Sequence, residues 1–362
     1  MKLLVTGACG FIGSHFVEHA LAAGHDVVGL CRGDRVDQRP TYVHLRRLGA
    51  RMISGDVLDG ADWRQVMDDV DCVVHFAAAF REAGIDEAYF RRVNVVGTAN
   101  LLAAAHAHGV QRFVLCSTAG IYGQRVPGVI DESKPVSPWN AYERSKVEAE
   151  DEVRRGARAL GMEYVILRPT AVYGPRDERL LKLFRSAARG RFPLFGAGEG
   201  RRHMVYVSDL ADAFLRACTQ PGAANEEMIV AGPEAVPLRE MLRTLAHLAN
   251  RRSCGPRLPL RPMLGLAALT EDLCNRFKIN PPLYRRRMDF YTNDAAFDSS
   301  HARRVLDWEP KVALRDGLAR TLHAQRPAVE VGVLRGYWWL AKLLPFASEP
   351  LDLLSRGALL FA

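Results

Sequence analysis

The chain has 362 residues, of which 48% are hydrophobic, 25% charged and 8% aromatic. This composition is typical of a soluble globular protein with one large or two smaller domains, and it excludes disordered, collagen-like and disulfide-framework chains. Seven dispersed cysteines show no metal-ligand spacing, so we expect reduced thiols, a cytoplasmic location and no metal site. The apolar run at residues 3–5 is too short for a signal peptide, and no window has the ~20 apolar residues of a membrane-spanning helix.

Basic residues are concentrated in one part of the chain. The net charge is +8, and residues 251–290 hold nine basic and three acidic residues. No aromatic-interleaved platform or helix-turn-helix pattern accompanies this patch, so we do not expect nucleic-acid binding. An anionic substrate or an anionic membrane surface explains the patch better.

Short apolar strands alternate with helical patterns through the first half of the chain. We expect strands at residues 2–6, 27–30, 52–53, 72–76, 113–117 and 164–167. Helices are expected between them, at residues 14–23, 61–69, 87–108 and 141–160. This alternation predicts an α/β fold with a doubly wound parallel sheet. Later helical patterns cover residues 180–188 and 237–250.

A glycine-rich turn joins the first strand to the first helix. It reads Thr6-Gly7-Ala8-Cys9-Gly10-Phe11-Ile12-Gly13, a TGxxGxxG spacing. Gly7 permits the tight turn, Gly10 lets the backbone approach a pyrophosphate, and Gly13 lets the helix pack against the sheet. Free N–H groups at the helix N-terminus can then bind phosphate. The turn predicts a Rossmann-type NAD(P) site formed by Gly7, Cys9, Gly10, Phe11, Ile12 and Gly13.

The end of the second strand bears on the choice between NAD and NADP. An acidic residue there would hold the 2′-hydroxyl of the NAD ribose. This chain has Cys31-Arg32-Gly33 instead. Arg32 can bind the 2′-phosphate of NADP, or it can be a solvated residue that stacks on adenine and suits either cofactor. We favour NADP over NAD.

A tyrosine and a lysine four residues apart predict the catalytic centre. Tyr142 and Lys146 form a YxxxK motif in the helical stretch 141–160, so both side chains lie on one helical face. A neighbouring ammonium favours the phenolate, which can exchange a proton with a substrate alcohol. Thr118 follows the fifth strand, where ligands of parallel sheets bind, and we expect it to orient the same substrate oxygen. Ser117 is the alternative for that role.

These motifs resemble the extended short-chain dehydrogenase/reductase superfamily, in its NAD-dependent epimerase/dehydratase group, over residues 1–325. The resemblance implies a Rossmann domain at residues 1–173 with a return segment at 203–232. It also implies a smaller C-terminal substrate lobe at residues 174–202 and 233–325. Further cofactor-contacting residues implied by the resemblance are Asp56, Val57, Ala77, Ala78, Asn94 and Pro169, together with Tyr142 and Lys146.

One departure from the family pattern bears on the reaction. Sugar-nucleotide 4,6-dehydratases of this group carry a Thr-Asp-Glu run whose acids perform the elimination. Here Thr118 is followed by Ala119 and Gly120, and we expect no acid nearby to replace the missing groups. Dehydration is therefore not expected, which leaves simple oxidoreduction or 4-epimerisation.

Two substrate classes compete. In sugar-nucleotide members arginines clamp the diphosphate, and Arg202 with Arg286 or Arg287 matches those places. The proline- and arginine-rich run at 281–287 instead resembles 3β-hydroxysteroid dehydrogenases, which act on lipophilic ring alcohols and often sit at membranes. The amphipathic tail at 326–362 suits a bilayer interface, although packing on the protein or in a dimer interface is an equal alternative.

We therefore expect an NAD(P)-dependent oxidoreductase that interconverts a secondary alcohol and a ketone on a lipophilic, sterol-like or lipid-linked substrate. A nucleotide-sugar 4-epimerase or reductase is the alternative. A non-catalytic dinucleotide-sensing scaffold is an alternative of another class, although such scaffolds usually lack the Tyr–Lys pair. We expect a cytoplasmic homodimer, with peripheral contact of the tail to the inner face of the cell membrane left open.

Overall fold

The computed structural model describes residues 1–324 except 34, 60–62, 81–85, 125, 179–182, 185, 188 and 277–284. The predicted tail at 326–362 and much of the predicted helix at 180–188 lie outside the described residues, so both stay predictions. Among the residues described, no helix is both long and apolar enough to cross a bilayer.

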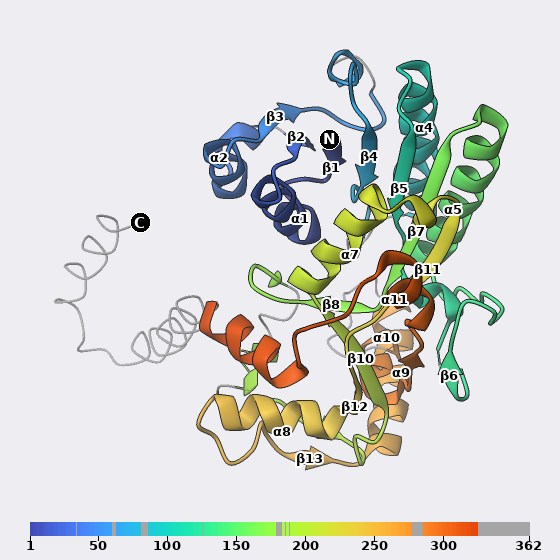
Figure 1. Cartoon of the computed structure of the whole chain (residues 1–362). Helices are drawn as coiled ribbons and strands as arrows, with labels where there is room; N and C mark the ends of the chain where they lie inside the picture. Colours follow the sequence, from blue (N-terminus) through green and yellow to red (C-terminus); the bar gives the residue numbers. More distant parts are fainter. Residues whose placement is uncertain are drawn as a thin grey trace, which may run out of the picture.

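A seven-stranded parallel sheet forms the centre of the larger part of the molecule (Figure 1). The strand order is β11-β7-β5-β4-β1-β2-β3. The predicted Rossmann-type α/β fold is confirmed, and all six predicted strands are present. The seventh strand, β11, was not predicted. The strands are β1 (Lys2–Thr6), β2 (Asp26–Cys31), β3 (Arg51–Ser54), β4 (Cys72–His75), β5 (Arg112–Cys116), β7 (Glu163–Pro169) and β11 (Glu226–Val230).

Helices cover both faces of this sheet, so the strands are buried on both sides (Figure 1). Alternate residues of β1 show the two layers: Leu3 and Val5 pack into the cluster on one face, and Leu4 packs into the cluster on the other. The first face is covered by α1 (Phe11–Ala22), α2 (Pro40–Arg47) and α7 (Val207–Thr219), and the second by α4 (Gly97–Ala107) and α5 (Ala141–Leu160).

Two predicted helices differ from the structure. The prediction of a helix at 61–69 is wrong for the described residues 63–69, where the structure has the 3₁₀ turn Arg64–Val66 in place of an α-helix. Buried Trp63 donates its indole N–H to the carbonyl of Asp56, which ties this segment down as a loop. The helix expected at 87–108 is interrupted: α3 (Glu87–Arg91) and α4 are joined by a π-helical segment, Arg92–Val96.

Later residues build a smaller part with short strands and helices (Figure 1). The helix predicted at 237–250 is present as Leu238–Leu248. The predicted domain boundaries stay predictions. One sheet of the smaller part consists of β8 (Ala171–Tyr173), β10 (Arg201–Tyr206) and β12 (Ala235–Pro237). Two further sheets have two strands each: β9 (Leu194–Phe195) pairs with β13 (Arg257–Leu258), and β14 (Ala296–Phe297) pairs with β6 (Val129–Ile130). The helices of the smaller part are α8 (Leu238–Leu248), α9 (Leu260–Arg276) and α10 (Arg285–Thr292), and residues 314–324 are also helical. The helix α11 (Ser300–Leu306) instead packs against β11 and α7 of the larger part.

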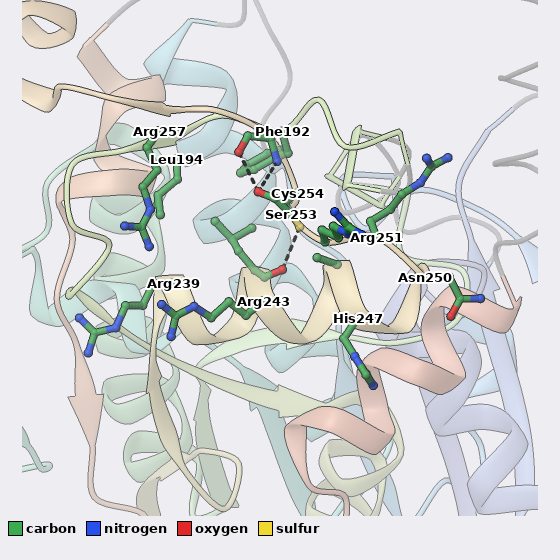
Figure 2. A pocket seen from close by; sticks show the side chains of 14 residues that line it. Phe192, Leu194, Arg239, Arg243, His247, Asn250, Arg251, Ser253, Cys254 and Arg257 are labelled. Atoms are coloured by element: carbon green, nitrogen blue, oxygen red, sulfur yellow. Dashed lines mark hydrogen bonds between the residues drawn. The ribbon is translucent and has the colours of Figure 1, made fainter.

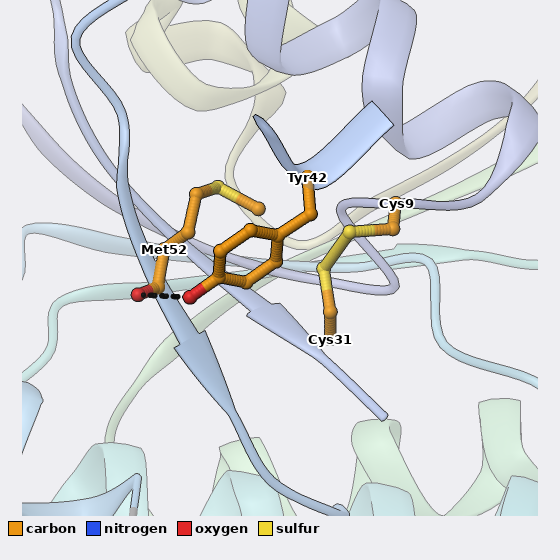
Figure 3. The surroundings of a disulfide bond; sticks show 4 residues. All are labelled: Cys9, Cys31, Tyr42 and Met52. Atoms are coloured by element: carbon orange, nitrogen blue, oxygen red, sulfur yellow. Dashed lines mark hydrogen bonds between the residues drawn. A yellow bond between two sulfur atoms is a disulfide. The ribbon is translucent and has the colours of Figure 1, made fainter. Parts of the chain in front are cut away.

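The expectation that every cysteine is reduced is wrong. Cys9 and Cys31 form a disulfide, with their Cα atoms 5.8 Å apart (Figure 3). Because β1 and β2 are adjacent parallel strands, the turn after β1 lies beside the last residue of β2. The free cysteines of the described residues are Cys72, Cys116, Cys218 and Cys254, which are buried, and Cys274, which is partly exposed.

A buried ionic network holds α5 against β5, β7 and β11. The Glu150 carboxylate on α5 is fully buried and accepts two hydrogen bonds from Arg168 on β7, at 3.0 and 2.7 Å. Ser117, after β5, donates its hydroxyl to the same carboxylate. Arg168 also donates to Glu227 on β11 and to the Tyr122 hydroxyl. The network fixes the position of α5, which carries Tyr142 and Lys146.

Close packing of the glycine turn gives a first prediction. A Cβ added at Gly13 would lie 2.3 Å from the carbonyl oxygen of Gly7, so Gly13→Ala must displace backbone. We expect a loss of about 1–3 kcal/mol in the free energy of unfolding, measured by denaturant titration. Gly265 on α9 is the matched control, since no atom lies within 4 Å of its added Cβ. Gly265→Ala should be neutral or stabilising by up to about 1 kcal/mol; equal losses in the two variants would contradict the packing argument.

The ionic network gives a second prediction. Glu150→Gln keeps the shape of the side chain but leaves Arg168, which is 4% exposed, without its charged bidentate partner. The free energy of unfolding should fall by about 1.5–3 kcal/mol, because the charged hydrogen bonds to Glu150 are lost while Glu227 still compensates the Arg168 charge in part. Glu152→Gln on the same helix is the control, because Arg155, its ion-pair partner, is 74% exposed. That change should cost less than about 1 kcal/mol. A Glu150→Gln variant as stable as the control would show that the network does not hold α5.

Candidate active site

The turn after β1 has the form of a pyrophosphate cradle. Gly7 has a φ of +67°, and a Cβ there would lie 2.8 Å from the backbone nitrogen of Ala77. Gly10 is the N-cap of α1, and no side chain caps the first turn of this helix. Phe11 and Ile12 form the start of α1 and are partly buried. The turn therefore leaves a helix N-terminus open to an anion, which fits a dinucleotide phosphate.

The tip of β2 carries one cation and lies next to one carboxylate. Arg32 donates to the Tyr89 hydroxyl at 2.8 Å and lies 3.8 Å from the Asp56 carboxylate. The Arg32 side chain is 49% exposed, so it is accessible to a ligand. Asp56 also accepts from the backbone N–H of Leu58, and neighbouring Val57 is buried. The structure thus brings Arg32, Asp56 and Val57 together, as expected for an adenosine subsite.

Asn94 links the loop after β4 to α5. Its side-chain amide accepts from the N–H of Ala79 at 2.7 Å and donates to the Ala79 carbonyl at 3.2 Å. It also donates to the Ser145 hydroxyl on α5, at 2.8 Å. Ala77 is partly buried and Ala78 exposed in the same loop. Asn94 therefore orients the predicted cofactor-contacting loop.

Tyr142 and Lys146 lie on α5 next to the carboxyl ends of the central strands. The Tyr142 ring packs edge-on against Phe80, with centroids 4.8 Å apart. Lys146 is 3% exposed and forms no hydrogen bond or ion pair with the part of the chain that the structure describes. Burial lowers the pKa of its ammonium, opposed by the Cys116 thiol and the Glu150 carboxylate. This buried cation is available to a ligand and to a phenolate.

His75, the last residue of β4, is a buried imidazole close to Lys146. Burial, with a smaller effect of Lys146, lowers the pKa of His75 to about 3, so this imidazole is neutral. His75 is hydrogen-bonded to the hydroxyls of Thr6 and Thr98, at 2.7 and 3.0 Å. It therefore holds strand ends together and does not act as an acid or base near neutral pH.

Thr118 and Ser117 have different surroundings. Thr118 accepts a hydrogen bond from the Gly120 N–H at 3.1 Å, which leaves its own hydroxyl hydrogen free to donate to a substrate oxygen. Ser117 is 3% exposed, and its hydroxyl donates to Glu150. The geometry favours Thr118 over Ser117 as the substrate contact, and both assignments stay predictions.

The expectation that no acid lies near Thr118 is wrong. A Cβ added at Gly120 would lie 3.2 Å from Oε1 of Glu143 and 3.3 Å from Oγ1 of Thr118. Glu143 reaches this place from the first turn of α5, where its other carboxylate oxygen accepts from the Trp139 N–H. The sequence holds the signal, because Asn140 and Glu143 have the spacing of a helix N-cap and its capping carboxylate.

Arg202 on β10 is a partly buried cation that forms no ion pair with a described residue. Its guanidinium donates to the carbonyls of Arg201, Asn293 and Phe290, the last at the end of α10. Burial lowers its pKa to about 10, so it is still charged at neutral pH. The structure thus places β10 against α10, which contains Arg286 and Arg287, although the side chains of those two lie outside the described part of the chain.

Pro169, the remaining residue predicted to contact the cofactor, is buried at the end of β7.

Part of the basic patch predicted at 251–290 lies away from these residues. It lines a hollow of about 770 Å³ between α8 and the segment 250–257 (Figure 2). The basic side chains of the lining are Arg239, Arg243, His247, Arg251, Arg252 and Arg257. Thr118, Tyr142 and Lys146 do not line this hollow, so the patch is not a wall of the candidate active site.

Comparisons with known proteins agree with this geometry. The chain is 31% identical to a UDP-glucose 4-epimerase of Mycolicibacterium smegmatis over 340 residues, covering 89% of this chain and 97% of that protein. It is 28% identical to a 2-alkyl-3-oxoalkanoate reductase of Stenotrophomonas maltophilia over 332 residues, covering 88% and 98%. The crystal structure of a Thermotoga maritima UDP-glucose 4-epimerase with UDP-glucose superposes with a TM-score of 0.71 at 25% identity, covering 91% and 100%.

The model of the NAD dependent epimerase/dehydratase family matches residues 3–232. This range contains the glycine turn, Asn94, Thr118 and the Tyr142–Lys146 pair. The resemblance to the family is therefore confirmed, while the narrower resemblance to 3β-hydroxysteroid dehydrogenases stays a prediction. The chain belongs to the NAD dependent epimerase/dehydratase family and is an NAD(P)-dependent enzyme.

Proposed function

We propose that this enzyme oxidises and reduces a secondary alcohol carbon of a nucleotide sugar, as a 4-epimerase or a reductase. The observation that carries the proposal is Arg202, a partly buried cation that forms no salt bridge with a described residue, although the Asp294 carboxylate acts on it from farther away. A diphosphate supplies the missing negative charge, and guanidinium–phosphate pairing is strong and directional. The likeness to a UDP-glucose 4-epimerase over 97% of that protein's length supports the same class.

Proton transfer is the task of Tyr142. In the oxidative direction its phenolate oxygen takes the proton of the substrate hydroxyl while hydride leaves the adjoining carbon. The buried ammonium of Lys146 stabilises the phenolate, and the Thr118 hydroxyl donates a hydrogen bond to the substrate oxygen. In the reductive direction Tyr142 returns the proton. The bound dinucleotide supplies the hydride acceptor or donor.

The dinucleotide is held by the turn at residues 7–13, the β2 tip and the loop after β4 in this proposal. NADP is favoured over NAD because Cys31 and Arg32 stand where an acid would select NAD. Epimerisation requires that hydride leave one face of the carbon and return to the other, with Tyr142 serving both half-reactions. Simple reduction uses the second half-reaction alone.

A lipophilic ketone or alcohol is the second candidate substrate. The likeness to a 2-alkyl-3-oxoalkanoate reductase, over 98% of that protein's length, favours it. It retains the roles of Thr118, Tyr142 and Lys146 but gives Arg202 no diphosphate; a carboxylate would take that place. Contact of the tail at 326–362 with a membrane accompanies this candidate, and the homodimer stays a prediction for either substrate class.

Loss of one hydroxyl tests the chemistry. Tyr142→Phe keeps the ring and removes the proton donor, so turnover should fall by about two to four orders of magnitude with cofactor binding almost unchanged. Tyr164→Phe on β7, a buried tyrosine outside the candidate site, is the control and should retain activity. Turnover is followed by NMR with UDP-glucose and by NADPH absorbance with 2-alkyl-3-oxoalkanoates. Near-normal turnover of Tyr142→Phe on the substrate that the wild type uses would contradict the role of Tyr142 as proton donor. Wild-type activity on the oxoalkanoates alone would favour the lipophilic substrate over the nucleotide sugar.

Charge reversal at the β2 tip tests the cofactor. If Arg32 binds a 2′-phosphate, Arg32→Asp should weaken NADPH binding by roughly 10- to 100-fold, as expected for a lost charged hydrogen bond, and change NADH binding little. Arg35→Asp makes the same change of charge at an exposed residue of the same loop and should have a small effect. Both ligands are titrated by fluorescence in a reducing buffer. Equal affinities of the wild type for NADH and NADPH would contradict the preference for NADP.

A further inference from the structure

We propose that Cys9 and Cys31 are a redox-modification site that controls dinucleotide binding, with the dithiol as the binding form and the disulfide as the weakly binding form. The proposal rests on the proposed function in one respect, namely that the turn at residues 7–13 binds a dinucleotide. No step of the proton transfer by Tyr142 uses either cysteine.

The backbone already brings the two cysteines to bonding distance. β1 and β2 pair in parallel with Thr6 opposite Leu30, and the Ala8 N–H continues the pairing by donating to the Leu30 carbonyl at 3.3 Å. The Cα atoms of Cys9 and Cys31 are 5.8 Å apart, within the ~4.4–6.8 Å range of disulfides. The strand pairing is independent of the sulfur–sulfur bond, so the pair can open and close without refolding of the sheet.

The bond lies in the adenosine subsite. Cys31 is the last residue of β2, the position from which dinucleotide-binding folds direct a side chain to the ribose hydroxyls. Cys9 lies in the glycine turn, between Gly7 and Gly10. As thiols, both side chains can donate weak hydrogen bonds and adapt to the ribose. In the disulfide form the N-terminus of α1 stays open to phosphate, but the two sulfurs carry no S–H and the bond ties the phosphate-binding turn to the strand tip, so binding is weakened and not abolished.

Local surroundings make Cys9 more accessible to exchange than the four buried free cysteines. Cys9 is partly exposed and lies in the loop directly before the N-cap of α1, so a small disulfide can reach its sulfur. Cys31 is 2% exposed and lies beside Tyr42 and Met52, so it is placed to resolve a bond formed at Cys9 (Figure 3). By contrast, burial raises the pKa of Cys116 to about 11.

The chemistry is thiol–disulfide exchange with a low-molecular-weight disulfide as the oxidant. The Cys9 thiolate attacks one sulfur of the oxidant, which forms a mixed disulfide and releases one small thiolate. The Cys31 thiolate then attacks the Cys9 sulfur and releases the second small thiol. Two protein thiols are oxidised, one small disulfide is reduced to two thiols, and a dithiol reductant reverses the exchange.

Titration of the full chain in two redox states tests the proposal. The protein is equilibrated with a dithiol or with a low-molecular-weight disulfide, and mass spectrometry after peptide mapping verifies the state of Cys9 and Cys31. NADH and NADPH are then titrated by fluorescence. We expect at least fivefold weaker binding of the preferred dinucleotide to the disulfide form, with recovery after the dithiol is added.

Single variants separate the disulfide from other effects of oxidation. Cys9→Ser and Cys31→Ala should bind the dinucleotide equally in both buffers, whereas Cys274→Ser, at a partly exposed cysteine outside the pair, should behave as the wild type. Equal or tighter binding to the verified disulfide form overturns the proposal, as does failure of the pair to oxidise. Absence of binding in both redox states instead refutes the dinucleotide site itself, and the redox proposal falls with it.

Discussion

The buried carboxylate of Glu150 is the interaction on which the candidate site depends. It joins α5 to the end of β5 through Ser117 and to β7 through Arg168, and Arg168 extends the connection to β11. Burial of an ionised group is unfavourable unless partners surround it, so the network forms only when α5 and the three strands are all in place. The positions of Tyr142 and Lys146 relative to Thr118 therefore depend on packing farther along the same helix.

Two cations give the site its electrostatic character. Lys146 and Arg202 are both at least partly buried, and neither forms a salt bridge with a described residue, although Glu150 and Asp294 act on them from farther away. A folded protein keeps such groups charged at a cost in desolvation, which ligands of opposite charge offset. Lys146 lies on α5 four residues after Tyr142, and Arg202 lies on β10 beside α10, within the smaller part of the molecule. In the proposed function the first cation serves proton transfer and the second serves substrate binding.

Much of the fold can be predicted from local sequence, and the exceptions have physical causes. Six strands are evident as apolar runs because both faces of the sheet are covered. β11 has a comparable apolar run at residues 228–230, so the sequence also held the signal for this strand, whereas the partners of the preceding Glu227, Arg168 and Arg154, are distant in the chain. The glycine turn and the YxxxK pair are short-range patterns, so they were recognisable. The Cys9–Cys31 bond, the place of Glu143 beside Gly120 and the Glu150 network depend on which strands and helices become neighbours, which no single segment encodes.

The π-helical segment Arg92–Val96 has a consequence for how this fold tolerates insertions and deletions. A π turn accommodates one residue more than an α turn, so it rotates the residues before it by about 100° relative to the residues after it. Asn94 sits inside this turn, and its three hydrogen bonds to Ala79 and Ser145 depend on that rotation. Removing one residue here would leave a longer, regular helix. In that helix the Asn94 amide would no longer face the loop after β4. The extra residue of the π turn thus sets the direction of the Asn94 side chain, and a change that made the helix regular would lose that direction.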